Sequence, residues 1–189
     1  MSLERKPQGT LSMITGCMYS GKTDKLLKHF FNNQKQGVEK SVLFKHDFDL
    51  NTKGNLVKSR TGLSHQARSI HSLGQLDSSL TNAGSGTTIY IDEIQFFPAS
   101  EFVHILALLQ RGIDVVVSGL DKDYLNNYFP ISKLVLDRSD NMERVYARCH
   151  ICGSFATHTH RVAKAKDLFV LDTGDNYEAR CNTHFVEGT

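Results

Sequence analysis

A glycine-rich stretch near the start of the chain carries residue types suited to binding nucleotide phosphates. Gly16 is followed after four residues by Gly21, Lys22 and Thr23, which matches the pattern G-x-x-x-x-G-K-[ST] in full. In such a loop the backbone N–H groups surround the phosphates, the Lys reaches the outer phosphates, and the hydroxyl residue binds Mg²⁺. The loop residues expected to bind ATP and Mg²⁺ are Gly16, Cys17, Met18, Tyr19, Ser20, Gly21, Lys22 and Thr23.

The same pattern also occurs by chance in unrelated turns, so the flanking sequence must decide. Residues 9–14 form a short apolar run that is typical of a buried strand. After the loop, apolar residues recur at helical spacing until Gly37 ends the helix, namely Leu26, Leu27, Phe30 and Phe31. Strand, glycine loop and helix follow in the order that a phosphate-binding loop requires, which favours that interpretation over a chance turn.

An acidic pair ends a second apolar run. Residues 87–92 read as a buried strand that finishes in Asp92, and Glu93 follows at once. In a phosphate-loop protein the strand-end Asp holds the hydration shell of Mg²⁺ beside Thr23, and the neighbouring Glu can accept a proton from the attacking group. The simpler alternative is an acidic cap between a strand and a helix. The pair also leaves the phosphate acceptor open, because a motor ATPase uses it to polarise water and a small-molecule kinase to deprotonate a hydroxyl.

Two short-spaced pairs of metal-binding side chains lie later in the sequence. Cys149 and Cys152 form a C-x-x-C pair, and Cys181 and His184 form a C-x-x-H pair. Together they complete a Cys₃His tetrahedron, the structural type of zinc site with no open catalytic position. The alternative is a set of free buried thiols. We predict a structural Zn²⁺ that stabilises a segment too small to have its own core.

The order of the apolar segments predicts the fold class. Three runs read as strands buried on both faces, as parallel strands are, at residues 41–45, 87–92 and 114–120. A helix is expected over residues 102–109, ended by Gly112. This is the pattern of an α/β protein wound around a parallel sheet.

The pattern changes after about Met142 to short segments rich in Cys, His and Gly. We therefore expect a phosphate-loop nucleotide-binding domain at residues 1–141 and a zinc-binding domain at residues 142–189. The polar residues 48–62 are expected to form a loop or a mobile hairpin.

Composition excludes some classes of function. The chain has 189 residues and a net charge of +2 with dispersed Lys and Arg, which gives no electrostatic footprint for duplex nucleic acid. The longest apolar run is far too short to cross a membrane, and the N-terminal residues lack the apolar region of a signal peptide. We expect a soluble cytoplasmic protein with reduced cysteines and neither nucleic acid nor membrane as a partner.

Seven motifs in order give the chain a close resemblance to a known family. They are GCMYSGKT, FKHDFD, SRTG, IDEIQFFP, GLDKDYLNNYF, ARCHICGSFATHTHR and GDNYEARCNTH. The chain resembles the cellular-type (type II) thymidine kinases over essentially its whole length. The resemblance implies a RecA-like α/β domain followed by a zinc domain with a lasso loop over the bound nucleoside. It also implies transfer of the γ-phosphate of ATP to the 5′-hydroxyl of thymidine or deoxyuridine in pyrimidine salvage, by a homotetramer.

The resemblance also assigns residues. Glu93 corresponds to the general base and Asp92 to the Mg²⁺-associated acid, while Asp49, Ile94 and Gln95 join the residues that contact ATP and its phosphates. The residues expected to bind the nucleoside are Met18, Phe96, Leu120, Tyr124, Phe129, Thr159, Leu168, Phe169, Val170, Leu171, Asp172 and Tyr177. For the aromatic residues the alternative is plain core packing. Phe96 and Tyr124, however, follow strand-end acids, where α/β sheets bind ligands.

Three positions depart from the family. After the second strand, His46 replaces a Pro, and Asn51 replaces an Arg, which puts a phosphate contact by Asn51 in doubt. Tyr124 stands where Phe is usual and adds a hydroxyl to the base pocket. His160 replaces a residue that is commonly Gln or Lys.

Two other functions were weighed. A phosphate-loop ATPase with a zinc knuckle acting on nucleic acid would need basic clusters and an arginine-rich face, and the sequence has neither. A regulatory nucleotide-binding module would have little reason to keep Glu93 beside Asp92.

Overall fold

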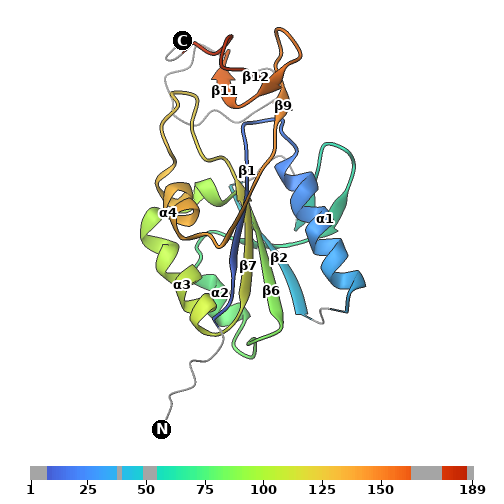
Figure 1. The fold of residues 1–189 in the computed structure, drawn as a ribbon. Helices are drawn as coiled ribbons and strands as arrows, with labels where there is room; N and C mark the ends of the chain where they lie inside the picture. The colour runs from blue at the N-terminus through green and yellow to red at the C-terminus, as the bar shows by residue number, and fades with distance from the viewer. Residues whose placement is uncertain (1–7, 38–39, 49–54, 163–175, 187–189) are drawn as a thin grey trace.

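Six parallel strands form the main sheet of the protein (Figure 1). They span Leu11–Thr15 (β1), Lys40–His46 (β2), Arg68–Ile70 (β5), Thr87–Asp92 (β6), Asp114–Gly119 (β7) and Asn141–Arg144 (β8). Their order is β5-β2-β6-β7-β1-β8, and every neighbouring pair is parallel. The computed structural model describes residues 8–37, 40–48, 55–162 and 176–186. The predicted α/β class with a parallel sheet is confirmed.

Helices cover both faces of this sheet (Figure 1). They span Lys22–Lys35 (α1), Gln75–Ser79 (α2), Phe102–Gln110 (α3) and Pro130–Arg138 (α4), with 3₁₀ turns at Ile94–Phe96 (η1) and Ala99–Glu101 (η2). On one face Leu26, Leu27 and Phe30 of α1 pack with Tyr90 of β6. On the other face α2, α3 and α4 contribute to the larger apolar core. None of the described helices is long and apolar enough to cross a bilayer.

The long elements begin and end close to the positions that the sequence predicts. β6 has the predicted bounds. The ends that were predicted for β1, β2, β7, α1 and α3 differ from the observed ends by at most a few residues. The sequence patterns do not predict β5, α2, α4 or β8. Because β8 pairs with β1 over Ser12–Thr15, the sheet continues across residue 142, where the expected division into residues 1–141 and 142–189 lies.

A hairpin lies beside α1. Its strands span Leu56–Lys58 (β3) and Ser64–Gln66 (β4) and pair antiparallel. Val57 is buried in the same cluster as Phe30 of α1, and the His65 ring lies 4.6 Å from the Phe30 ring. The hairpin occupies the later part of the polar stretch 48–62 and extends beyond it.

Four short strands follow the sheet: Ala147–Arg148 (β9), Phe155–Ala156 (β10), His158–Arg161 (β11) and Tyr177–Arg180 (β12). β9 pairs with β10 and β11 pairs with β12, both antiparallel. In Figure 1 they lie above the carboxyl ends of the central strands. Their buried cluster consists of small side chains only: Cys17, Ala147, Cys149, Ala156, Ala179 and Cys181.

Candidate active site

The predicted phosphate loop lies between the end of β1 and the start of α1. Gly16 has a φ of +156°, and a Cβ there would lie 2.2 Å from the carbonyl oxygen of Val145, so a side chain does not fit. Gly21 has a φ of +85° and directly precedes α1. Tyr19 has a φ of 66°, which is uncommon for a non-glycine residue. The loop therefore follows a constrained path into the N-terminus of α1, where the helix dipole and free N–H groups favour phosphate.

The loop lysine is held against the loop itself. Lys22 is only 8% exposed, and its Nζ donates to the Cys17 carbonyl oxygen at 2.9 Å. The Ser20 hydroxyl donates to the same oxygen at 2.7 Å. Thr23, half-buried, follows in the first turn of α1. The ammonium group and the hydroxyl thus both lie at the edge of the sheet where phosphates would bind.

Asp92 is fixed at the carboxyl end of β6. It is buried, and its Oδ1 accepts hydrogen bonds from the Ser118 hydroxyl of β7 and, at 3.1 Å, from the Glu93 backbone N–H. Lys45, also buried, is its register partner on β2. Because β7 alone separates β6 from β1, this carboxylate and the phosphate loop lie at the same edge of the sheet.

Glu93 is oriented by Gln95. The Gln95 side chain donates through Nε2 to Glu93 Oε2 at 2.5 Å and accepts through Oε1 from the Leu120 backbone N–H at 3.0 Å. Glu93 itself has a left-handed backbone with a φ of 56°. A Cβ on Gly119 would lie 2.5 Å from Gln95 Oε1, so this approach requires glycine at the end of β7. The result is a half-buried carboxylate with a set direction, which suits a general base.

The amide of Gln95 is therefore already engaged inside the protein. Its side chain is buried and links the acidic pair to the loop after β7. Ile94 is fully buried, and its side chain packs in the main core. The expected contacts of these two residues with ATP stay predictions. Asp49 lies outside the described residues.

The loop between β7 and α4 carries three of the expected nucleoside-binding residues, Leu120, Tyr124 and Phe129. Asp123 Oδ1 accepts from the backbone N–H groups of Leu125 at 2.9 Å and Asn127 at 2.8 Å, which closes the loop on itself. Tyr124 is half-buried, and Phe129 is 9% exposed.

The same loop is fixed to the sheet and to the strands above it. Asp121, which is buried, forms an ion pair with Arg144 of β8 at 2.8 Å. The guanidinium carbon of Arg161 on β11 lies 4.8 Å from the centre of the Tyr124 ring. The loop is therefore anchored both to β8 and to β11.

Phe96 belongs to an aromatic group at the ends of β2 and β6. Its ring centre lies 5.4 Å from that of Phe48 and 5.8 Å from that of His46. The His46 Nδ1 accepts the Phe48 backbone N–H at 2.9 Å. Burial lowers the pKa of His46, which keeps the ring neutral and able to accept this bond. The histidine that replaces the family proline thus closes a turn beside the expected base pocket.

The C-terminal strands contact the phosphate loop directly. The Met18 backbone N–H donates to Thr159 Oγ1 on β11 at 3.0 Å, and the Cys17 thiol donates to the Ala156 carbonyl oxygen at 3.4 Å. Tyr177 of β12 is buried and is the register partner of Arg161. The resemblance assigns Met18, Thr159 and Tyr177 to nucleoside binding, and the structure brings the first two into contact. Residues 168–172, expected to form the lasso contacts, lie outside the described residues.

The four predicted zinc ligands come together. Their ligand atoms all lie within 4.8 Å of one another, with 3.8 Å between the sulfurs of Cys152 and Cys181. The Nδ1 atom of His184 lies 3.2 Å from the Cys181 sulfur and 3.8 Å from the Cys149 sulfur. A tetrahedral ion with Zn–S bonds of about 2.3 Å places its sulfurs about 3.8 Å apart, so the cluster has the size that Zn²⁺ needs.

The cluster also favours the thiolate that a metal requires. Desolvation by burial opposes ionisation of Cys149, but backbone hydrogen bonds from Cys181 and Cys152 outweigh it and lower its pKa to about 6. Cys17 differs, because burial raises the pKa of its thiol. The predicted zinc ligand Cys149 therefore loses its proton more readily than Cys17 of the phosphate loop.

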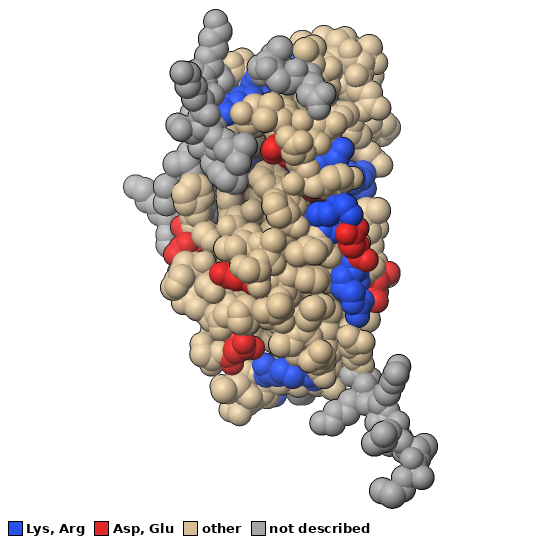
Figure 2. Space-filling model, turned by 90° about the vertical axis from the view of Figure 1, so that its left-hand side faces the viewer, with Lys and Arg blue, Asp and Glu red and all other residues tan. Residues whose placement is uncertain are grey.

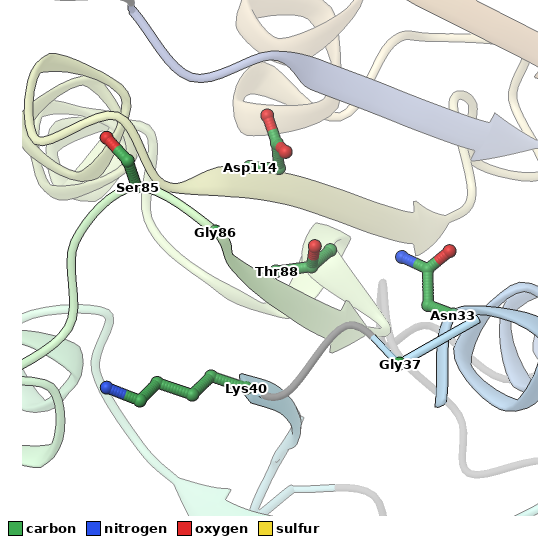
Figure 3. Close-up of a pocket in the computed structure, with 7 residues that line it drawn as sticks. All are labelled: Asn33, Gly37, Lys40, Ser85, Gly86, Thr88 and Asp114. Carbon is green, nitrogen blue, oxygen red and sulfur yellow. The ribbon is translucent and has the colours of Figure 1, made fainter. Parts of the chain in front are cut away.

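A polar pocket lies at the opposite end of the sheet. It has a volume of about 500 Å³ and lies at the amino ends of β2, β6 and β7 (Figure 3). It is lined by Asn33, Gly37, Lys40, Ser85, Gly86, Thr88 and Asp114. The Asp114 carboxylate accepts from both the N–H and the hydroxyl of Thr10. Parallel sheets bind ligands at the carboxyl ends of their strands, so we do not place the nucleotide in this pocket.

Sequence reasoning assigned no role to three residues that shape the site. Ser118 orients Asp92, Arg161 stacks on Tyr124, and Arg60 stacks on Tyr19. Arg60 and Arg161 lie within motifs that carry the family resemblance, so those motifs could have pointed to these two residues. Ser118 lies inside an apolar run and gave no signal.

Comparison with known proteins identifies the relatives of the chain. The family model described as thymidine kinase matches residues 9–185. A protein of Mesoplasma florum named thymidine kinase is 32% identical, with 98% of this chain and 96% of that protein covered. A thymidine kinase of Thermococcus kodakarensis is 33% identical over 95% of each chain. One of Coprothermobacter proteolyticus is 34% identical, with 93% of this chain and 90% of that protein covered.

Proposed function

The chain belongs to the thymidine kinase family, and we propose that it transfers the γ-phosphate of ATP to the 5′-hydroxyl of thymidine or deoxyuridine. Thymidine kinase activity follows from the family match and from the names of the relatives. The finer parts of the proposal are the donor and acceptor atoms, the residue roles and the use of the reaction in pyrimidine deoxynucleoside salvage.

One observation carries the residue assignment. The Glu93 carboxylate is held by Gln95, whose other end binds the backbone of Leu120 in the expected nucleoside-binding loop. The side-chain amide of Gln95 therefore positions both the proposed general base, Glu93, and the start of the loop that would hold the nucleoside. This link favours proton abstraction from a small bound molecule, because the base is positioned relative to the nucleoside pocket.

The proposed transfer uses residues at the carboxyl edge of the sheet. Glu93 accepts the proton of the 5′-hydroxyl while O5′ attacks the γ-phosphorus, and the bond from that phosphorus to the oxygen of ADP breaks. Lys22 and the loop N–H groups bind the phosphate oxygens. Thr23 and Asp92 would hold Mg²⁺, which neutralises phosphate charge when bound. The hydrogen bond from Ser118 keeps Asp92 oriented for this role.

The nucleoside is proposed to lie between the phosphate loop, the loop after β7 and β11. Met18 and Thr159 are already joined by a hydrogen bond, and Tyr124 lies under Arg161. We propose that Met18 and Tyr124 surround the base methyl group. Backbone groups of residues 168–172 would read O4 and N3–H of thymine, as the resemblance implies.

The cysteine cluster has a structural role in this proposal. All four ligand positions come from the protein, so the Zn²⁺ would have no open site for chemistry. Its ligands Cys149 and Cys181 directly follow β9 and β12, so the ion would hold these two strands together, and through β12 it would keep β11 with Thr159 next to the phosphate loop. We also propose that the chain divides by role into residues 1–141, which contain the phosphate loop, and residues 142–189, which contain the zinc ligands and β11. The homotetramer implied by the resemblance is also a proposal, which sedimentation equilibrium can test.

The charge distribution gives no support to a nucleic-acid-driven ATPase. On the face that Figure 2 shows, basic side chains lie beside acidic ones along one edge, and much of the surface is uncharged. ATP consumption with thymidine and with single-stranded DNA separates the two functions. We expect thymidine, but not single-stranded DNA, to stimulate ADP release, and we expect the thymidine to be converted to its 5′-monophosphate. Stimulation by DNA without a phosphorylated nucleoside would overturn the proposal.

A further inference from the structure

The tip of the β3–β4 hairpin places a cation on the phosphate loop. The guanidinium carbon of Arg60 lies 3.8 Å from the centre of the Tyr19 ring, which is stacking distance. Tyr19 lies between the two glycines of the loop, Gly16 and Gly21. Arg60 is exposed, although Ser59 before it is buried. The hairpin therefore presents a solvent-accessible positive charge at the site where phosphates would bind.

The position of this tip is fixed by α1. The hydroxyls of Ser59 and Thr61, on either side of Arg60, both donate to Oδ1 of Asp24. Asp24 also pairs with Lys28 at 2.7 Å. The hydrogen bonds from Lys28 and then from Thr61 lower the pKa of Asp24, so the carboxylate stays charged and keeps accepting both hydroxyls.

The tip is also closed by its own backbone. The Ser59 N–H donates to the Leu63 carbonyl oxygen at 2.7 Å, and the Gly62 N–H donates to the Ser59 carbonyl oxygen at 3.1 Å. Asp24 directly follows Thr23 in the first turn of α1. Arg60 is thus the long, exposed side chain of a hydrogen-bonded turn that contacts both the phosphate loop, at Tyr19, and the first turn of α1, at Asp24.

Other basic side chains at this edge have different surroundings. Lys22 is buried and bound to the Cys17 carbonyl oxygen, Lys45 is buried at the end of β2, and Arg144 is paired with Asp121. Transfer of a phosphoryl group spreads negative charge over its outer oxygens, and an arginine aimed at them is a common way to stabilise it. The planar guanidinium can bind two such oxygens at once.

We propose that Arg60 is a catalytic residue that binds the γ-phosphoryl oxygens during transfer. This inference rests on the proposed function. As O5′ bonds to the γ-phosphorus and its proton passes to Glu93, the bond to the ADP oxygen breaks and Arg60 stabilises the charge on the oxygens of the group in transit. The contact with Tyr19 holds the guanidinium nearby before ATP binds. An exposed cation–π contact is weak, so phosphate can displace it.

The test compares Arg60→Ala and Arg60→Lys with a matched control. Arg148 is also exposed and also stacks on an aromatic ring, with its guanidinium carbon 4.9 Å from the Phe155 ring centre. Arg148→Ala therefore removes the same kind of contact far along the chain from the phosphate loop. For each variant we would measure kcat, the KM values for ATP and thymidine, the melting temperature, and the effect of added millimolar guanidinium ion.

We expect Arg60→Ala to lower kcat by about 10²-fold or more, with the KM for thymidine within a few-fold of the parent value. Arg60→Lys should retain part of the rate, and guanidinium ion should raise the rate of Arg60→Ala but not of the parent protein. Arg148→Ala should leave kcat unchanged. The inference is overturned by a kcat within threefold of the parent, or by a loss that guanidinium ion does not rescue, since either indicates at most a structural contact.

The parent protein separates this inference from the proposed function. If the parent protein makes no thymidine monophosphate, the proposed function itself is wrong, whatever the variants do. If it makes the product and Arg60→Ala does so equally fast, only the role of Arg60 is wrong.

Discussion

The main sheet and the C-terminal strands bury very different side chains. The core around β1, β6 and β7 contains large residues such as Leu108, Ile105 and Phe44, all fully buried. The buried members of the apolar cluster under β9 to β12 are only Ala and Cys, although Tyr177 of β12 is buried beside it. A core of that kind removes little apolar surface from water, so we expect the proposed Zn²⁺ to supply much of its stability.

The two regions nevertheless contact each other. Hydrogen bonds from Met18 to Thr159 and from Cys17 to Ala156 join the phosphate loop to the C-terminal strands. In the proposed function the two regions therefore have separate roles: the sheet edge would hold the acid, the base and the phosphate loop, and the metal-bound strands would form a wall beside them. Substitutions that affect one region and leave the other unchanged test this separation of roles.

Loss of zinc should have the largest effect. We expect Cys181→Ser to abolish metal binding, since apparent free energies for structural Zn²⁺ are about 10–16 kcal/mol in small zinc domains. Metal analysis should find one zinc per chain in the parent and in Cys17→Ser, a matched thiol substitution at a cysteine that is not one of the four predicted ligands. Hydrogen exchange should accelerate in β9 to β12 and stay slow in β6 and β7. Zinc-free parent protein with protected C-terminal amides would contradict this.

Removal of the base should come next. Glu93→Gln should lower turnover by roughly 10²–10⁴-fold, the usual range for losing a general base, while ATP binding and zinc content stay unchanged. Glu143→Gln is the control, because Glu143 pairs with Lys25 on the surface at 2.6 Å. Isothermal titration and steady-state rates measure both. Turnover of Glu93→Gln within a few-fold of the parent would remove it from this role.

Core truncation should separate the regions by stability. Phe30→Ala should cost about 3–5 kcal/mol, because a fully buried ring leaves a cavity between α1 and β6. Phe155→Ala on β10 should cost under about 1 kcal/mol, since Phe155 is 66% exposed. Urea unfolding of the two variants gives both numbers. Equal costs would show that the C-terminal strands depend on packing as much as the sheet does.

Alkaline pH should weaken the sheet by a smaller amount. Burial raises the pKa of Tyr90 to about 12, above the value near 10 of an exposed tyrosine. The unfolded chain therefore ionises first, so stability is complete below about pH 10 and falls by roughly 2–3 kcal/mol as pH rises to about 12. Tyr90→Phe should remove this slope, whereas Tyr146→Phe, at an exposed residue, should retain it. An unchanged slope in Tyr90→Phe would assign it to other groups.

Local sequence patterns predicted most of the central sheet and the ligand sets. Buried strands and amphipathic helices have characteristic patterns of apolar residues, so β6 and α3 could be predicted. The phosphate-loop and zinc-ligand motifs have short, recognisable spacings, so the cysteine pairs could be located as well. β5 and β8 carry no such period, because they lie at the two edges of the sheet and are short. Their place follows from pairing with distant strands.

The contacts that orient the site could not be predicted in the same way. Ser118 reaches Asp92, and Arg60 reaches Tyr19, across long stretches of chain, so no local spacing records either contact. Gln95 is close to Glu93 in sequence, but its second bond, to Leu120, depends on β6 and β7 being neighbours. Tertiary structure decides which nearby polar groups are engaged.

We propose above all that this edge of the sheet phosphorylates thymidine. The most direct test is kcat/KM with ATP for thymidine, deoxyuridine, deoxycytidine and the purine deoxynucleosides, with the labelled product identified. We predict thymidine first and deoxyuridine next, since one methyl group in an apolar pocket is worth about 10–200-fold. Deoxycytidine and the purines should fall roughly 10³-fold or more behind, because mismatched buried polar groups are costly. Equal kcat/KM for deoxycytidine and thymidine, or no labelled thymidine monophosphate, would contradict the claim.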